Sequence, residues 1–166
     1  GLYCRDCQLL INIPNIKGLE ALYCRDCPLL INIPNIKGLE ILECNSCILL
    51  EEIPKIDTLI KLNCDNCSLL TNIPQLDNLT QLYCRSSTLI TTIPNIKGLE
   101  CLDCSNCPLL TSIPNMKKLK ILYSAYNPLL TNIPNAKEYN DYDKNLLKLP
   151  FKECEFLVSN KVKKLY

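Results

Sequence analysis

The chain has 166 residues, the length of one domain, and its 18 basic and 17 acidic residues give a formal net charge of +1. This balance provides no electrostatic attraction for nucleic acid or for an anionic membrane surface, so we expect neither partner. Histidine is absent. Because histidine is the commonest general base and activator of nucleophiles, we expect no enzyme, no catalytic residue and no cofactor.

A repeat of 20 residues covers most of the chain. Its clearest marker is an Ile-Pro pair, whose prolines are Pro14, Pro34, Pro54, Pro74, Pro94, Pro114 and Pro134. A fixed period of this length is typical of a solenoid, in which each repeat buries its apolar face against its neighbours. We therefore predict one solenoid of seven repeats over residues 1–138, with the first repeat incomplete.

Each repeat divides into two halves. The first half has the spacing shown by Leu19, Leu22, Cys24, Cys27 and Leu29. Alternation around Leu22 and Cys24 predicts a short strand with one buried face. In the second half, Pro34 fixes its own φ and favours an extended Ile33, which predicts an extended return segment. The sequence thus predicts a mainly-β solenoid with parallel strands.

This pattern resembles the leucine-rich repeat, in the short class found in bacterial effector proteins. The cysteine-containing repeats are also similar to predicted repeat proteins of amoeba-infecting giant DNA viruses. The resemblance implies a right-handed coil with a concave parallel sheet and an extended, polyproline-like convex side. It further implies a non-enzymatic module that binds a protein partner, as the substrate-recognition part of a larger protein.

The repeat pattern decays after Pro134. A spacing of 20 residues would place Tyr139 and Tyr142 at the two leucine positions of the next strand. Because the end of a solenoid core must be covered, we expect residues 139–166 to form an irregular C-terminal cap.

The chain contains 13 cysteines, many of them in Cys-x-x-Cys pairs such as Cys4 and Cys7. This spacing is compatible with four-cysteine zinc sites. However, the cysteine positions also hold Ser87, Ser124 and Asn127, and a solenoid would keep the pairs in parallel columns. We therefore expect buried free thiols and no metal, in a reducing compartment such as the cytoplasm. A zinc-binding or redox-active thiol protein is an alternative.

The strand residues that point away from the core form the candidate binding surface. The alternation predicts two outward columns that contain mainly aromatic and charged side chains. Tyrosine and arginine are frequent in protein interfaces. The predicted protein-binding residues are Tyr3, Arg5, Tyr23, Arg25, Glu43, Asp65, Tyr83, Arg85, Asp103 and Tyr123. A second hypothesis is a structural protein that assembles end to end through its uncapped first repeat.

Overall fold

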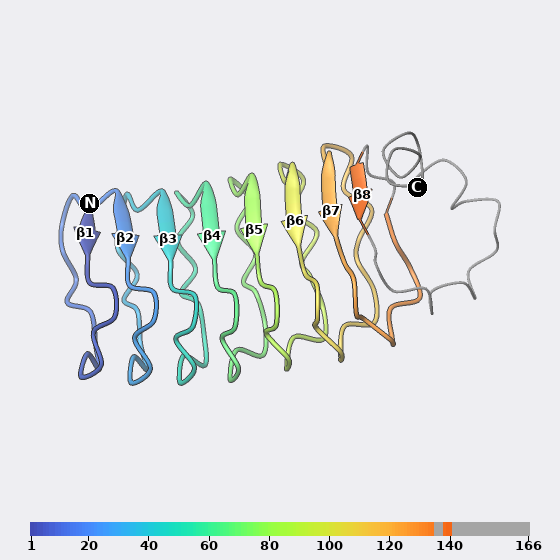
Figure 1. Ribbon diagram of the computed structural model, residues 1–166. Helices are drawn as coiled ribbons and strands as arrows, with labels where there is room; N and C mark the ends of the chain where they lie inside the picture. Colours follow the sequence, from blue (N-terminus) through green and yellow to red (C-terminus); the bar gives the residue numbers. More distant parts are fainter. Residues whose placement is uncertain (135–137, 141–166) are drawn as a thin grey trace, which may run out of the picture.

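The computed structural model describes residues 1–134 and 138–140, and the described part contains eight strands and no helix (Figure 1). All the strands are parallel and form one sheet in chain order. Their bounds are β1 (Leu2–Tyr3), β2 (Ala21–Tyr23), β3 (Ile41–Glu43), β4 (Lys61–Asn63), β5 (Gln81–Tyr83), β6 (Cys101–Asp103), β7 (Ile121–Tyr123) and β8 (Glu138–Asn140). The predicted mainly-β solenoid is confirmed.

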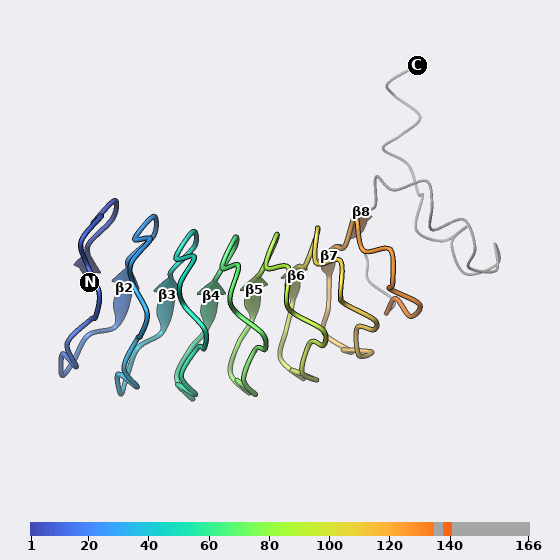
Figure 2. The same cartoon turned by 90° about the horizontal axis from the view of Figure 1, so that it is seen from below.

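The strands line one wall of the solenoid and the return segments line the other (Figure 2). Successive return segments are extended, and they form isolated parallel bridges such as Asn12 with Asn32 and Thr92 with Ser112. The proline in each return segment removes a donor and restricts the residue before it, which accounts for the lack of regular secondary structure there. Strands contact only their immediate neighbours in the sheet, as expected for a solenoid.

The register between strands is constant until the last pair. From β1 to β7 each residue pairs with the residue 20 positions later, as Leu2 does with Leu22. Between β7 and β8, Leu122 instead pairs with Tyr139, a step of 17 residues. The expected alignment of Tyr139 with Leu119 is therefore wrong, because this return is three residues shorter. The predicted cap after Asn140 lies outside the described residues.

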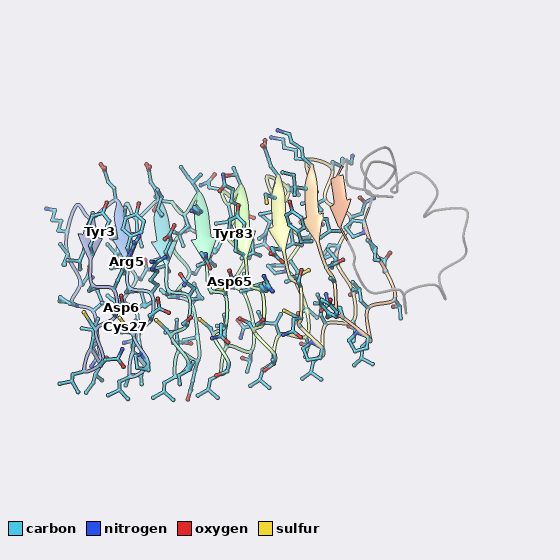
Figure 3. All side chains as sticks on the ribbon, viewed as in Figure 1. Tyr3, Arg5, Asp6, Cys27, Asp65 and Tyr83 are labelled. Atoms are coloured by element: carbon cyan, nitrogen blue, oxygen red, sulfur yellow. The ribbon has the colours of Figure 1, made fainter. Side chains whose placement is uncertain are left out.

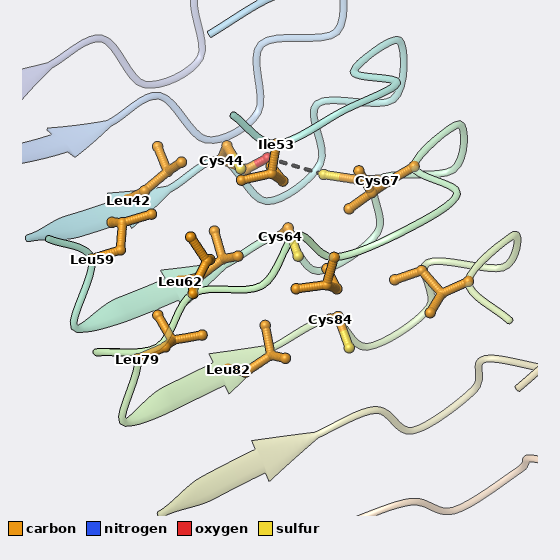
Figure 4. Close-up of a cluster of buried hydrophobic side chains, with 14 of the residues drawn as sticks. Leu42, Cys44, Ile53, Leu59, Leu62, Cys64, Cys67, Leu79, Leu82 and Cys84 are labelled. Carbon is orange, nitrogen blue, oxygen red and sulfur yellow. Dashed lines mark hydrogen bonds between the residues drawn. The ribbon is translucent and has the colours of Figure 1, made fainter. Parts of the chain in front are cut away.

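Equivalent side chains from successive repeats stack into one continuous core. Leu42, Leu62 and Leu82, which pair in register on β3, β4 and β5, are fully buried (Figure 4). Leucines and isoleucines of the return segments, such as Leu50 and Ile53, belong to the same core. Burying a leucine contributes roughly 1.5–3 kcal/mol, so the stack of aliphatic columns is the main source of stability.

A sharp corner follows every strand from β1 to β7. Its second residue has a positive φ in each repeat, at Asp6, Asp26, Ser46, Asn66, Ser86, Asn106 and Tyr126. Aspartate and asparagine tolerate this left-handed conformation better than other non-glycine residues do. Tyr126, with a φ of 62°, is the bulky exception. The corner also extends the hydrogen bonding between repeats, since the Asp26 N–H donates to the Asn45 carbonyl at 2.9 Å.

Candidate functional site

The second cysteine of each pair belongs to a column of hydrogen-bond donors inside the solenoid. The Cys27 Sγ donates to the Cys4 carbonyl at 2.9 Å, one repeat earlier. The Cys67 Sγ donates to the Cys44 carbonyl at 3.2 Å, drawn as a dashed line in Figure 4. Because the strand has ended at this carbonyl, the side chain satisfies a buried acceptor that the sheet leaves unpaired.

This role explains which residues replace cysteine in the donor column. Ser87 Oγ donates to the Cys64 carbonyl at 2.8 Å, and Asn127 Nδ2 donates to the Cys104 carbonyl at 2.9 Å. Asn127 Oδ1 also accepts the Cys107 N–H at 2.7 Å. The position therefore requires a compact side chain that carries a hydrogen-bond donor. This requirement explains the residues found there without any thiolate chemistry.

Burial raises the pKa of several thiols, whereas a hydrogen bond with the thiol of the preceding repeat lowers the pKa of Cys47 and of Cys107. Desolvation raises the pKa values of Cys64 and Cys104 and raises the pKa of Cys27 to about 11. The twelve cysteines among the described residues are free, and no three metal-binding side chains converge in that part of the chain. Protonated, buried thiols are poor nucleophiles, so buried cysteines with a raised pKa, such as Cys64 and Cys104, are suited to packing and hydrogen bonding.

The ten predicted binding residues all alternate with buried or partly buried residues along the strands and corners, and we call the side that they share the sheet face. Figure 3 labels four of them, Tyr3, Arg5, Asp65 and Tyr83. All ten are partly or fully exposed. The register places them in two adjacent columns, six in a central column on the strands and four in a corner column just after them. The central column holds Tyr3, Tyr23, Glu43, Tyr83, Asp103 and Tyr123, and the corner column holds Arg5, Arg25, Asp65 and Arg85.

Internal contacts occupy most polar groups in the N-terminal half of the sheet face. The Tyr3 and Tyr23 rings stack, with centroids 4.6 Å apart and planes inclined by 6°. The Arg5 guanidinium lies 5.6 Å from the Tyr23 ring centroid and 4.0 Å from Glu43 Oε2. Arg25 Nε lies 3.7 Å from Asp26 Oδ2, which offsets the repulsion between neighbouring arginines.

Glu43 holds a second cation, which the sequence did not single out. Lys61 Nζ lies 2.8 Å from Glu43 Oε1 and 5.9 Å from the centroid of the Tyr83 ring. Lys61 reaches both groups from a third column, on the other side of the central column. Two positive side chains of the protein therefore each bridge the Glu43 carboxylate and a tyrosine ring.

The C-terminal half of the sheet face contains a concavity of about 560 Å³ around Asp103, which we call the Asp103 concavity. Three predicted residues, Arg85, Asp103 and Tyr123, form part of its wall. The other lining residues, which sequence reasoning missed, are Ser105, Asn106, Ala125 and Tyr126. The small side chain at Ala125 among larger neighbours is the signal that could have indicated a hollow.

Asp65 and Tyr83 adjoin this region. Asp65 Oδ1 accepts the Arg85 N–H at 2.7 Å, yet burial raises the pKa of the Asp65 carboxyl to about 6. Burial raises the pKa of Tyr83 to about 12, and the hydrogen bond that joins Tyr83 Oη and Cys101 Sγ, 3.7 Å apart, adds to this shift. Tyr83 is thus neutral near pH 7, whereas Asp65 is largely ionised.

A second surface feature, a leucine ridge, was not predicted. The first residue of each Leu-Leu or Leu-Ile pair is at least partly exposed, and the next residue, Leu30 or its equivalent, is buried in every repeat but the first, where Leu10 is partly buried. The exposed fraction is 40% for Leu29 and 85% for Leu9. The ridge consists of Leu9, Leu29, Leu49, Leu69, Leu89, Leu109 and Leu129. The ridge thus repeats one leucine that is at least partly exposed in every turn of the solenoid.

The geometry defines a class: this is a cysteine-rich repeat protein whose 20-residue units build a parallel β-solenoid. No model of a known protein family, no curated protein and no solved structure matches the chain. The described residues contain no helix long and apolar enough to span a membrane. Its function must therefore be inferred from its own residues.

Proposed function

We propose that this protein is a non-enzymatic interaction module that binds a protein partner on its sheet face. The observation that carries the proposal is the pair of exposed columns, which place tyrosines, arginines and carboxylates side by side over β1–β7. At about 4.8 Å per strand the seven strands present roughly 30 Å of surface, enough for a protein patch or an extended segment.

We further propose that the repeats are of the leucine-rich class. In that class the position after the strand is usually asparagine, and here it belongs to the donor column. Asn127 makes two hydrogen bonds to the preceding repeat, and the cysteines reproduce one of them. The many free buried thiols support a cytoplasmic setting. End-to-end association through the first repeat remains a prediction.

The test is a pair of double substitutions, measured against a partner captured from the source cells and then purified. Replacing Tyr83 and Arg85 by alanine should weaken binding by at least about 2 kcal/mol, because such residues are frequent hot spots. The melting temperature should change little, since both side chains are at least partly exposed.

The control is the replacement of Lys97 and Lys117 by alanine. Both lysines are exposed on the return side of the solenoid, away from the sheet face. This variant should bind like the wild type. Loss of binding in the lysine variant, with normal binding by the Tyr83 and Arg85 variant, would place the partner on the opposite side.

A further inference from the structure

The two halves of the sheet face share a tyrosine and carboxylate pair at an offset of 60 residues. Tyr23 and Glu43 in the N-terminal half correspond to Tyr83 and Asp103 in the C-terminal half. Each pair places a tyrosine beside a carboxylate on the next strand of the sheet. In the first half, side chains of the protein itself bind to this pair. The first half therefore shows which chemical groups such a pair binds.

In the first half the carboxylate has two cations. Arg5 lies over the Tyr23 ring and 4.0 Å from Glu43, and Lys61 lies 2.8 Å from Glu43. Shifted by 60 residues, Arg5 corresponds to Asp65 and Lys61 corresponds to Ile121. The second half thus keeps the tyrosine and the carboxylate and replaces both cations, one of them by a second carboxylate.

Asp103 consequently has no cationic partner within residues 1–134. Its Oδ1 accepts the Ser105 N–H at 3.0 Å, and no lysine or arginine of this region lies within ion-pair distance. Arg85, which also lines the concavity, is outweighed by Asp103 and the adjoining Asp65. With both carboxylates ionised, these three groups carry a net charge of −1.

Aromatic side chains and open space surround this negative charge. Tyr123 follows Asp103 in the central column and is 37% exposed. The small Ala125 leaves space between Tyr123 and Tyr126. Tyr126 adopts a left-handed backbone conformation. At the equivalent position of the six other repeats the residue is aspartate, serine or asparagine. Strain of this kind is typically found where a side chain serves a ligand.

We propose that the Asp103 concavity binds one positively charged side chain, lysine or arginine, of a protein partner. The cation pairs with Asp103, as Arg5 and Lys61 pair with Glu43. It lies against the ring of Tyr123, which lines the concavity together with Asp103. Asp65 supplies the additional negative charge that offsets Arg85. This inference rests on the proposed function, since it names the chemistry of the partner at one point of the sheet face.

The direct test is a titration of the full chain, labelled with ¹⁵N, with small blocked amino acids. N-acetyl-arginine methylamide and N-acetyl-lysine methylamide should shift the amide signals of Ser105 and Tyr123 in a saturable way. The neutral isostere N-acetyl-citrulline methylamide should bind at least about tenfold more weakly, because a hydrogen bond to a charged group is lost. Equal shifts with citrulline, or no saturable shift with arginine, would overturn the proposal.

Two variants make the test specific. Asp103→Asn keeps an acceptor for the Ser105 N–H and removes the charge, so binding of the arginine compound should fall at least about tenfold. Asp65→Arg places an arginine at the position that Arg5 has in the first half. Its side chain should occupy the concavity in place of the ligand and abolish binding. Asp57→Asn, on an exposed return segment, is the matched control and should leave binding unchanged. Undiminished binding by the Asp103→Asn protein would refute the assignment.

A peptide library displayed on phage and selected against the full chain separates this proposal from the broader one. Peptides that contain lysine or arginine, lose binding to Asp103→Asn and lose it to the Tyr83 and Arg85 variant would support both. Peptides that require Tyr83 and Arg85 but ignore Asp103 would overturn the cation site and leave the sheet face as the binding surface. Peptides indifferent to all three substitutions would contradict both.

Discussion

Asp65 is a residue whose ionisation costs stability. Burial raises the pKa of its carboxyl to about 6, above the ordinary value of 3.8. The folded state therefore binds a proton more readily than the unfolded state does, so the cost is full above about pH 6 and disappears as the pH falls toward 4.

We expect Asp65→Asn to stabilise the protein by about 1–2 kcal/mol at about pH 8, after allowance for partial solvent screening. Asparagine retains an oxygen that can accept the Arg85 N–H. At about pH 4 the difference from the wild type should nearly vanish. Urea unfolding at the two pH values measures this, and a stabilisation that is independent of pH would contradict the role of the charge.

At the scale of single residues, the sequence predicted which side chains face outward but not their contacts. Alternation in β2–β7 was sufficient to place Tyr83 and Asp103 on the same side. Whether a carboxylate has a cation depends on side chains from other repeats, as with Glu43 and Lys61. The left-handed Tyr126 was equally unpredictable, because a tyrosine carries no signal for that conformation.

At the scale of the elements, the Leu-Leu pair of each repeat has one surface residue and one core residue. Leu70 is fully buried and Leu69 is 38% exposed. Leu70→Ala should therefore reduce the free energy of unfolding by about 2–5 kcal/mol, because it leaves a cavity. Leu69→Ala should cost less than about 1 kcal/mol.

The two variants carry the same substitution at adjacent positions, so each is the control for the other. Chemical denaturation measures the free energy of unfolding of both. Similar losses for both would mean that Leu69 is packed against another surface. The sequence alone did not distinguish the two leucines. Turns at residues 25–26 and 28–29, and their equivalents, interrupt the strand alternation before the pair is reached.

At the scale of the whole molecule, burial should protect most of the thiols from reaction in the native protein. In denaturant a thiol reagent should modify all 13 cysteines. In the native protein Cys4 and Cys7, which are partly exposed, should react first. The buried cysteines of the central repeats should react at least about 100-fold more slowly, because the solenoid must open to expose them. Elemental analysis that finds stoichiometric zinc would contradict this interpretation.

The overall architecture could be predicted from the sequence because the same pattern of residues occurs in every repeat. Seven copies of the Ile-Pro marker fixed the period, and the period fixed the register from β1 to β7. The 17-residue step to β8 could not be predicted, because the marker is lost after Pro134. The Asp103 concavity was also missed, since it arises from the differences between repeats.

The near identity of the first two repeats has a consequence for inheritance. Residues 1–20 and 21–40 differ only at Gly1 and Ala21 and at Gln8 and Pro28. Coding sequences this similar can misalign during recombination, which removes or adds one whole repeat at a time. Because each strand contacts only its neighbours, such a change lengthens or shortens the sheet without disturbing any register. A copied repeat can then acquire a new side chain on its exposed face, so that the sheet face can vary in both length and composition.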